Sequence, residues 1–181
     1  MKKIIGITGT IASGKDYIGD YISQELQIPI FQISKPIIDA AKEAGIPLTR
    51  KNITEFAPKF AKRVGADYSA RIHLQNIENQ GIITGMRQIA QIQYLRNNSD
   101  LTLIAIDADP KIRFERAQSR NKFQEATTLE QFIKDEQEEN SGYHIQRVFD
   151  CMKLADHQIY NNSTLENLHN QIDLLLKIKS R

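Results

Sequence analysis

The amino-acid sequence predicts an α/β fold in which helices cover both faces of a parallel β-sheet. Short apolar runs rich in branched residues alternate with longer helical segments along the chain, which is the order of repeated β-α-β units. Two of these runs, KIIGIT at 3–8 and LTLIAID at 101–107, show almost no polar alternation. That pattern is typical of central strands that are buried on both faces.

The bulk composition limits the classes of partner. The chain has 181 residues, of which 40% are hydrophobic, so we expect one domain over residues 1–181 with one substantial core. Its net charge of +2 and evenly spread Lys and Arg residues argue against nucleic acid or a membrane as partner and favour small anions. The start MKKIIGITGT lacks the apolar length of a signal peptide, so we expect a cytoplasmic protein, either a monomer or a homodimer.

Five strands and several helices follow from the pattern. The strands are expected at 3–8, 28–33, 82–84, 101–107 and 157–160. An insertion of about residues 34–80 between the second and third strands predicts two or three helices, with breaks near Gly45, Pro47, Pro58 and Gly65. Asp109 before Pro110 is expected to cap the helix after the fourth strand. The single cysteine, Cys151, is expected to pack in a helix.

A polar stretch of about residues 120–146 follows that helix. It holds a short helical pattern and little apolar surface, which is typical of a lid that closes over bound phosphates. Its acidic run is expected to face solvent; the run comprises Asp135, Glu136, Glu138 and Glu139.

The sequence GTIASGKD at 9–16 lies between the first strand and its helix. Gly9, Gly14 and Lys15 follow the phosphate-binding pattern G-x-x-x-x-G-K-[ST]. Glycines let such a loop turn its N–H groups inward, and the helix N-terminus adds about half a positive charge. Lys15 adds a full charge near the β- and γ-phosphates. We therefore expect the whole loop to bind the polyphosphate of a nucleotide; its residues are Gly9, Thr10, Ile11, Ala12, Ser13, Gly14 and Lys15.

Asp16 departs from the pattern, which normally has a magnesium-binding hydroxyl at this position. One interpretation is a residue that caps the helix and complements its dipole. The other is a hard oxygen ligand for Mg²⁺, bound directly or through water. A carboxylate beside polyphosphate repels it unless a divalent cation lies between them, so we favour the metal interpretation.

Cationic side chains occur at several places where they could surround the phosphates. Arg113, Arg116 and Arg120 have the spacing i, i+3 and i+7, which places them on one helix face after the fourth strand. Phosphoryl transfer depends on positioning and charge stabilisation, so we expect Arg116 and Arg120 to close over the transferring group. On spacing alone, a solvated helix face is the alternative.

Three more cationic residues are candidates for binding the phosphoryl acceptor. Arg87 follows the third strand, at the edge where ligands of open α/β sheets bind, and Lys35 and Arg50 lie in the insertion. We expect all three to bind the acceptor. The alternatives are an ion pair for Arg87 and simple exposure for Lys35 and Arg50.

With these motifs in one order, nearly the whole chain resembles the P-loop nucleoside monophosphate kinase superfamily. The run R-x-x-R-x-x-x-R at 113–120 and LADHQIYNNSTLENL at 154–168 are similar to the dephospho-coenzyme A kinase and adenylate-kinase-like groups. The GKD ending of the loop resembles phage-type deoxynucleoside monophosphate kinases and animal-type phosphomevalonate kinases. Those families pair it with an arginine after strand three, which matches Arg87.

The resemblance implies a three-layer αβα P-loop NTPase fold with a five-stranded parallel sheet in the order 2-3-1-4-5, a helical acceptor-binding insertion and a lid. It also implies ATP as donor, Mg²⁺, and Asn161 or Asn162 near the adenine, of which we favour Asn162. We expect a kinase that transfers the γ-phosphoryl to a phosphate-bearing small molecule, namely a nucleoside or deoxynucleoside monophosphate. The expected catalytic residues are Lys15, Arg87, Arg116 and Arg120.

One departure from these families concerns strand three. Related kinases often carry an acidic residue near the end of this strand, where the present chain has Thr84. Together with Asp16, this indicates a redistributed magnesium shell. The alternatives are a dephospho-coenzyme A kinase and a regulator that binds ATP without transferring it.

Overall fold

The sheet at the centre of the molecule is all parallel, with the strand order β2-β3-β1-β4-β5. The structure, a computed structural model, describes residues 1–119, 128–141 and 146–178. The strands are β1 (Lys3–Gly9), β2 (Ile30–Gln32), β3 (Gln80–Met86), β4 (Asp100–Asp107) and β5 (His157–Tyr160). All five expected strands are present, and the expected order is confirmed.

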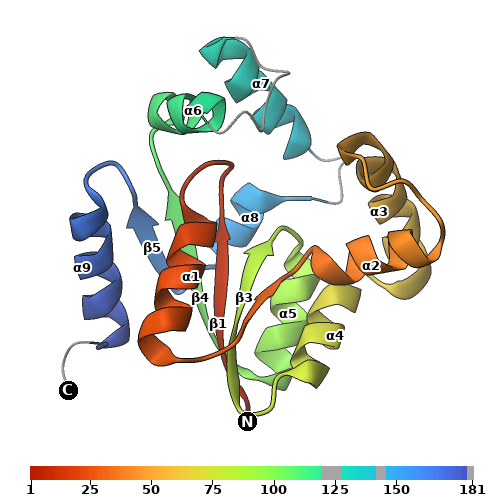
Figure 1. Cartoon of the computed structure of the whole chain (residues 1–181), viewed down its shortest axis with the longest axis horizontal. Helices are drawn as coiled ribbons and strands as arrows, with labels where there is room; N and C mark the ends of the chain where they lie inside the picture. Colours follow the sequence, from red (N-terminus) through yellow and green to blue (C-terminus); the bar gives the residue numbers. More distant parts are fainter. Residues whose placement is uncertain (120–127, 142–145, 179–181) are drawn as a thin grey trace.

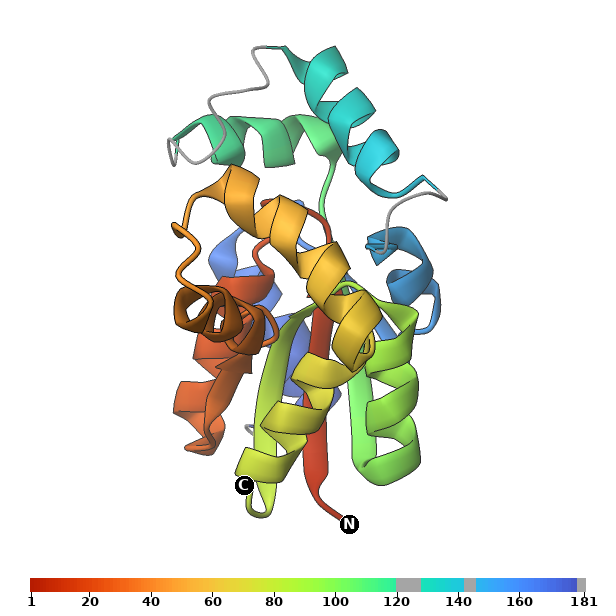
Figure 2. The same ribbon diagram turned by 90° about the vertical axis from the view of Figure 1, so that its right-hand side faces the viewer.

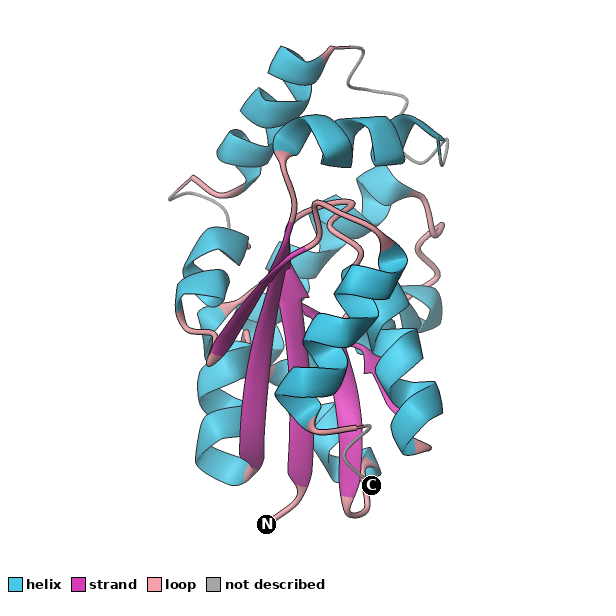
Figure 3. Cartoon of the chain, turned by 90° about the vertical axis from the view of Figure 1, so that its left-hand side faces the viewer, coloured by secondary structure: helices cyan, strands magenta, loops and turns pink. Residues whose placement is uncertain are grey.

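Helices cover both faces of the sheet (Figures 1 and 3). On one face, α1 (Lys15–Leu26) and α9 (Leu165–Leu176) bury Ile18 and Ile172 against Ile7 and Ile104 of the strands. On the other face lie α4 (Tyr68–Asn76), α5 (Ile89–Asn98) and α8 (Val148–Lys153). These two apolar layers account for the unbroken hydrophobic runs of β1 and β4.

Cys151 of α8 belongs to the second of these layers and is fully buried. Burial raises the pKa of its thiol to about 12, so the thiolate is disfavoured at neutral pH. The expected packing role of Cys151 is confirmed.

The insertion contains three helices, α2 (Lys35–Glu43), α3 (Arg50–Val64) and α4. Breaks occur at Gly45 and Gly65 as expected, but the expected break at Pro58 is wrong, because α3 continues through it. Proline removes one backbone bond from a helix interior. Here the helix is held on both sides of Pro58, since Phe56 stacks on Phe60 and Phe60 contacts the edge of Tyr68.

Two further helices, α6 (Pro110–Ser119) and α7 (Leu129–Glu139), lie beyond the carboxyl ends of the strands (Figure 2). The predicted cap of α6 is confirmed, because the Asp109 carboxylate accepts a hydrogen bond from the backbone N–H of Lys111 at 2.9 Å. Arg120 and much of the predicted lid lie outside the described residues. In the part of the chain that is described, no helix is long and apolar enough to cross a membrane.

Candidate phosphate-binding site

The backbone of the loop between β1 and α1 requires glycine at two positions. Gly14 has a φ of 99°, and a Cβ atom there would lie 2.6 Å from Nδ2 of Asn161. A Cβ atom on Gly9 would lie 2.1 Å from the carbonyl oxygen of Ile106 on β4. Side chains at these two positions are therefore excluded by close contacts and, since φ is 152° at Gly9 and 99° at Gly14, also by conformation.

The rest of the loop forms a concave backbone surface. Ala12 has a φ of 59°, in the left-handed region, and the turn is closed by a bond from the Ser13 N–H to the Thr10 carbonyl at 3.4 Å. The first amides of α1 have no partner within their own helix. Such a combination of left-handed residues and a helix N-terminus makes an anion-binding concavity, so these residues fit the polyphosphate that the motif predicts.

Two charged side chains stand at the start of α1. Lys15 is 8% exposed, and its ammonium donates to the Thr10 carbonyl at 3.4 Å, which places the charge across the loop. Asp16 is exposed in the first turn. No group of three or more His, Cys, Asp or Glu residues among the described positions could hold a metal by itself. Nucleotide-bound Mg²⁺ needs only one or two carboxylates besides phosphates and water, so Asp16 fits this ion, and its metal role stays a prediction.

Arg116 of α6 reaches the loop through Asn161, which follows β5. Its Nη2 atom donates to the Asn161 carbonyl at 3.1 Å and to Oδ1 at 3.4 Å. The Asn161 amide donates in turn to the Ser13 carbonyl at 2.8 Å. Asn162, the residue expected near the adenine, is exposed and accepts from the Asp109 N–H at 2.7 Å. The structure thus brings Asn161 against the loop, and the adenine contact of Asn162 stays a prediction.

Arg113 is directed away from solvent, into an ion pair with α7. Its Nη1 and Nη2 atoms donate to the two carboxylate oxygens of Glu136 at 2.7 and 2.8 Å, and both side chains are less than a tenth exposed. The expectation that Glu136 faces solvent is therefore wrong. Phe132 and Glu136 are four residues apart and share the buried face of α7.

Sequence reasoning missed Asp107 at the end of β4. Its Oδ1 atom accepts from the Thr10 hydroxyl at 2.6 Å and from the Ala108 N–H at 2.9 Å, and Arg113 Nε lies 3.5 Å away. The signal was available, because β4 is adjacent to β1 in the predicted order and the carboxyl ends of parallel strands share one edge. Asp107 orients Thr10 of the loop.

Arg87 lies on the other side of β1, just after β3. Its Nη1 atom donates to the amide oxygen of Gln146 at 3.1 Å, and its carbonyl accepts from the Arg147 N–H at 2.8 Å. No carboxylate of the described residues forms an ion pair with Arg87. The anion-binding role of Arg87 stays a prediction.

Thr84 lies within β3, which continues to Met86. Its side chain is 2% exposed, and its methyl group would lie 2.7 Å from a Cβ atom on Gly19 of α1. The Thr84 side chain is therefore packed under α1 and shielded from solvent.

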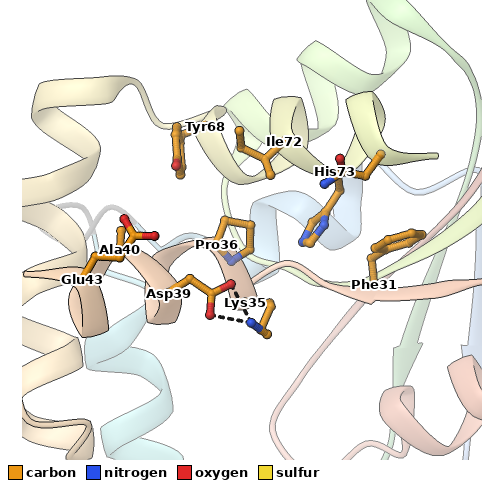
Figure 4. Close-up of a pocket in the computed structure, with 10 residues that line it drawn as sticks. Phe31, Lys35, Pro36, Asp39, Ala40, Glu43, Tyr68, Ile72 and His73 are labelled. Carbon is orange, nitrogen blue, oxygen red and sulfur yellow. Dashed lines mark hydrogen bonds and ion pairs between the residues drawn. The ribbon is translucent and has the colours of Figure 1, made fainter.

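The insertion forms a cavity of about 260 Å³ between β2, α2 and α4 (Figure 4). Lys35 lines it and forms an ion pair with Asp39 on the next turn, with both side chains exposed. His73 lines it as well; burial lowers the pKa of its imidazole, and since a carbonyl only accepts, Nε2–H donates to the Gln32 carbonyl at 2.8 Å. The acceptor role of Lys35 stays a prediction, as does that of Arg50, which begins α3 and whose side chain lies outside the description.

Comparisons with known proteins agree with this geometry. A family model described as an AAA domain matches residues 5–158. The chain is also similar to a UPF0200 protein of Methanoculleus marisnigri, with 31% identity over 96% of this chain and 95% of that protein. A UPF0200 protein of Methanococcus maripaludis is 30% identical over 97% and 96% of the two chains. The protein therefore belongs to the AAA domain family and to the UPF0200 proteins.

Solved structures with this fold include small-molecule kinases. A shikimate kinase of Acinetobacter baumannii in complex with shikimate has a TM-score of 0.64 at 13% identity, covering 100% of this chain and 96% of that one. A shikimate kinase of Aquifex aeolicus gives 0.61 at 19% identity and 96% coverage of both chains. The APS kinase of Mycobacterium tuberculosis, in complex with AMPPNP and APS, gives 0.58 at 11% identity, with 97% and 98% covered. The chain thus has the P-loop kinase fold.

Proposed function

We propose that this protein is an ATP- and Mg²⁺-dependent kinase that transfers the γ-phosphoryl group to a nucleoside or deoxynucleoside monophosphate. The observation that carries the proposal is the convergence of three features on one sheet edge. They are the loop with its left-handed backbone, the ammonium of Lys15 across it, and Arg116 held against it by Asn161. The fold shared with shikimate and APS kinases supports the same reaction class.

Each side chain has a distinct part in this proposal. Lys15 and the loop amides bind the donor phosphates, and Arg116 stabilises the charge of the transferring group. Mg²⁺ supplies charge neutralisation between the donor phosphates when it is bound, and Asp16 is the residue that fits it.

The charge at Arg87 supports a phosphate-bearing acceptor. Its side-chain partner is the neutral amide of Gln146, so the guanidinium is available to an anion at the carboxyl end of β3. Thr84, packed under α1, provides no general base there. A phosphate oxygen is already ionised at neutral pH and needs little proton transfer, whereas a hydroxyl acceptor profits from a base.

The test is transfer from labelled ATP to a panel of acceptors. The panel contains ribonucleoside and deoxynucleoside monophosphates, dephospho-coenzyme A, phosphomevalonate and shikimate. We expect labelled product with at least one monophosphate, lost in Lys15→Met and retained in Lys42→Met, which removes an exposed lysine of α2.

Other results would replace the proposal. Product only with dephospho-coenzyme A or shikimate would identify a hydroxyl kinase. Binding of ATP that depends on Lys15, with no product from any acceptor, would identify a nucleotide-binding regulator.

A further inference from the structure

Arg113 occupies a position between the phosphate loop and α7. Its side chain is 4% exposed, and its guanidinium is bonded on two sides. Toward the loop, Nη1 donates to the Ile11 carbonyl at 3.3 Å, and toward α7 the bidentate pair with Glu136 closes at 2.7 and 2.8 Å. Nε donates to the Ala108 carbonyl at 2.9 Å, which fixes the plane of the group.

Asp107 extends these contacts to a loop side chain. Its Oδ1 atom lies 3.5 Å from Arg113 Nε and accepts from the Thr10 hydroxyl at 2.6 Å. Two consecutive loop residues, Thr10 and Ile11, are therefore tied to one guanidinium, Ile11 directly and Thr10 through Asp107.

The α7 side of the arrangement is equally well packed. Phe132, one turn before Glu136, lies under the Arg113 guanidinium at 5.6 Å from its ring centroid and contacts Phe114 of α6 at 5.7 Å. The exposed face of α7 carries a looser pair, Lys134 and Glu138, at 3.9 Å. Of these two ion pairs on the described part of α7, the buried one includes a residue, Arg113, that is also bonded to the loop.

A contribution to stability does not by itself explain the buried pair of Arg113 and Glu136. Desolvating two charges opposes their attraction, and well-packed apolar side chains in the place of a buried ion pair are often as stable. What a bidentate arginine pair adds is a fixed orientation of both partners. Here that orientation is imposed on a backbone carbonyl of the phosphate loop.

From these contacts we infer that Arg113 is a positioning residue that couples the conformation of the phosphate loop to the docking of α7. Arg116 of the same helix has a different role. It is bonded to Asn161, and in the proposed function it stabilises the charge of the transferring phosphoryl group. The part of the inference that concerns ATP affinity rests on the proposed function, whereas the coupling between loop and α7 is a property of the protein without nucleotide.

The test compares two substitutions on α7. Glu136→Gln keeps the shape of the side chain, removes its charge and changes no residue that Arg113 contacts in the loop. Glu138→Gln changes the exposed pair on the same helix. Hydrogen exchange is measured without nucleotide for the loop amides at 9–16 and for α7 at 129–139.

We expect exchange in Glu136→Gln to rise about 10-fold in the loop and in α7 together, because coupling between two sites typically changes an equilibrium by about 5- to 150-fold. Glu138→Gln should leave the loop unchanged. Faster exchange in α7 with an unchanged loop would overturn the inference and leave a merely structural ion pair.

Glu136→Gln removes the charged partner that Arg113 has on α7. The double variant Arg113→Met/Glu136→Leu is measured in case the single variant does not fold. It leaves no buried charge from the pair, so α7 should stay docked, yet loop exchange should still rise. Unchanged loop exchange in this folded variant would also overturn the inference.

ATP titration separates this inference from the proposed function. We expect ATP affinity to fall about 10-fold in Glu136→Gln and in the double variant and to stay at the wild-type value in Glu138→Gln. If wild-type protein binds no ATP, the proposed function fails, and the exchange measurements without nucleotide still decide the coupling.

Discussion

The phosphate loop and the helical insertion are held in different ways. In the loop, left-handed backbone at Ala12 and Gly14 and the buried contact with Asn161 fix the main chain. In the insertion, Lys35 and Asp39 pair in solvent, and Gly45, which also has a positive φ, has no atom within 4 Å of a Cβ position.

This difference between the loop and the insertion predicts which side of the proposed site tolerates amino-acid substitution. The proposed donor side depends on backbone geometry, for which few side chains can substitute. The proposed acceptor side consists of side chains on partly exposed helices, so under this proposal acceptor specificity can vary while the loop stays the same. Substitutions on the two sides should therefore have different consequences.

Removing the charge of Arg116 should have the largest effect. We expect Arg116→Ala to lower kcat by about 10³-fold, as for other arginines that stabilise the transition state of phosphoryl transfer. Steady-state kinetics with the accepted monophosphate measure this. Arg96→Ala is the control, because Arg96 pairs with Asp156 away from the loop. A kcat within twofold of wild type for Arg116→Ala would leave this residue as a structural partner of Asn161.

Glycine substitutions compare the two regions directly. Gly14→Ala introduces a Cβ atom at a φ of 99° and 2.6 Å from the Asn161 amide, whereas Gly45→Ala meets only an unfavourable φ of 69°. We expect Gly14→Ala to lower the free energy of unfolding by about 1–3 kcal/mol and to weaken ATP binding. Gly45→Ala should cost less and leave ATP binding intact. Urea unfolding and ATP titration measure both, and equal costs would contradict the distinction between the regions.

Neutralising Arg87 and Lys35, two of the three expected acceptor-side cations, should have unequal effects. Arg87 has a neutral partner, Gln146, whereas Lys35 is already paired with Asp39. We expect Arg87→Met to raise the acceptor KM about 30-fold, the value of a lost charge-assisted hydrogen bond, and Lys35→Met to raise it less than threefold. ATP affinity should be unchanged in both. A larger KM increase in Lys35→Met would place the acceptor phosphate at α2.

The regular parts of the molecule could be predicted because their signals are local. A buried parallel strand is an unbroken apolar run, and the loop needs glycine at positions that the motif already marks. The β4 segment and Gly14 are examples, and both occur where the sequence places them.

The errors lie where tertiary contacts decide. Within the acidic run of α7, Glu136 differs from Glu138 only in its spacing of four residues from Phe132. The partner of Glu136, Arg113, lies on another helix. Pro58 is a helix breaker by propensity, yet aromatic contacts on both sides keep α3 continuous. The Asp107 contact could be inferred only by combining the predicted strand order with the shared sheet edge, which brings the end of β4 beside Thr10. Each of these depends on the packing of segments distant in sequence.

Asp16 offers the smallest and most selective change to the donor side. If this exposed carboxylate helps hold Mg²⁺, Asp16→Ala should raise the Mg²⁺ concentration for half-maximal ATP binding about 10-fold, the effect typical of losing a group that supports a metal ion. Asp16→Ser should recover part of that loss, because a hydroxyl is an oxygen ligand of the kind found at this position in related loops. Both should bind ATP similarly at saturating Mg²⁺.

Thermal unfolding without nucleotide supplies the control for Asp16. A residue that only complements the helix dipole contributes to stability, typically by 0.3–1 kcal/mol, and not to the dependence on Mg²⁺. Reduced stability of both variants with an unchanged Mg²⁺ requirement would therefore assign Asp16 to the helix. An altered requirement at unchanged stability would assign it to the metal, and would explain how a loop with a carboxylate in place of the usual hydroxyl can still hold a polyphosphate.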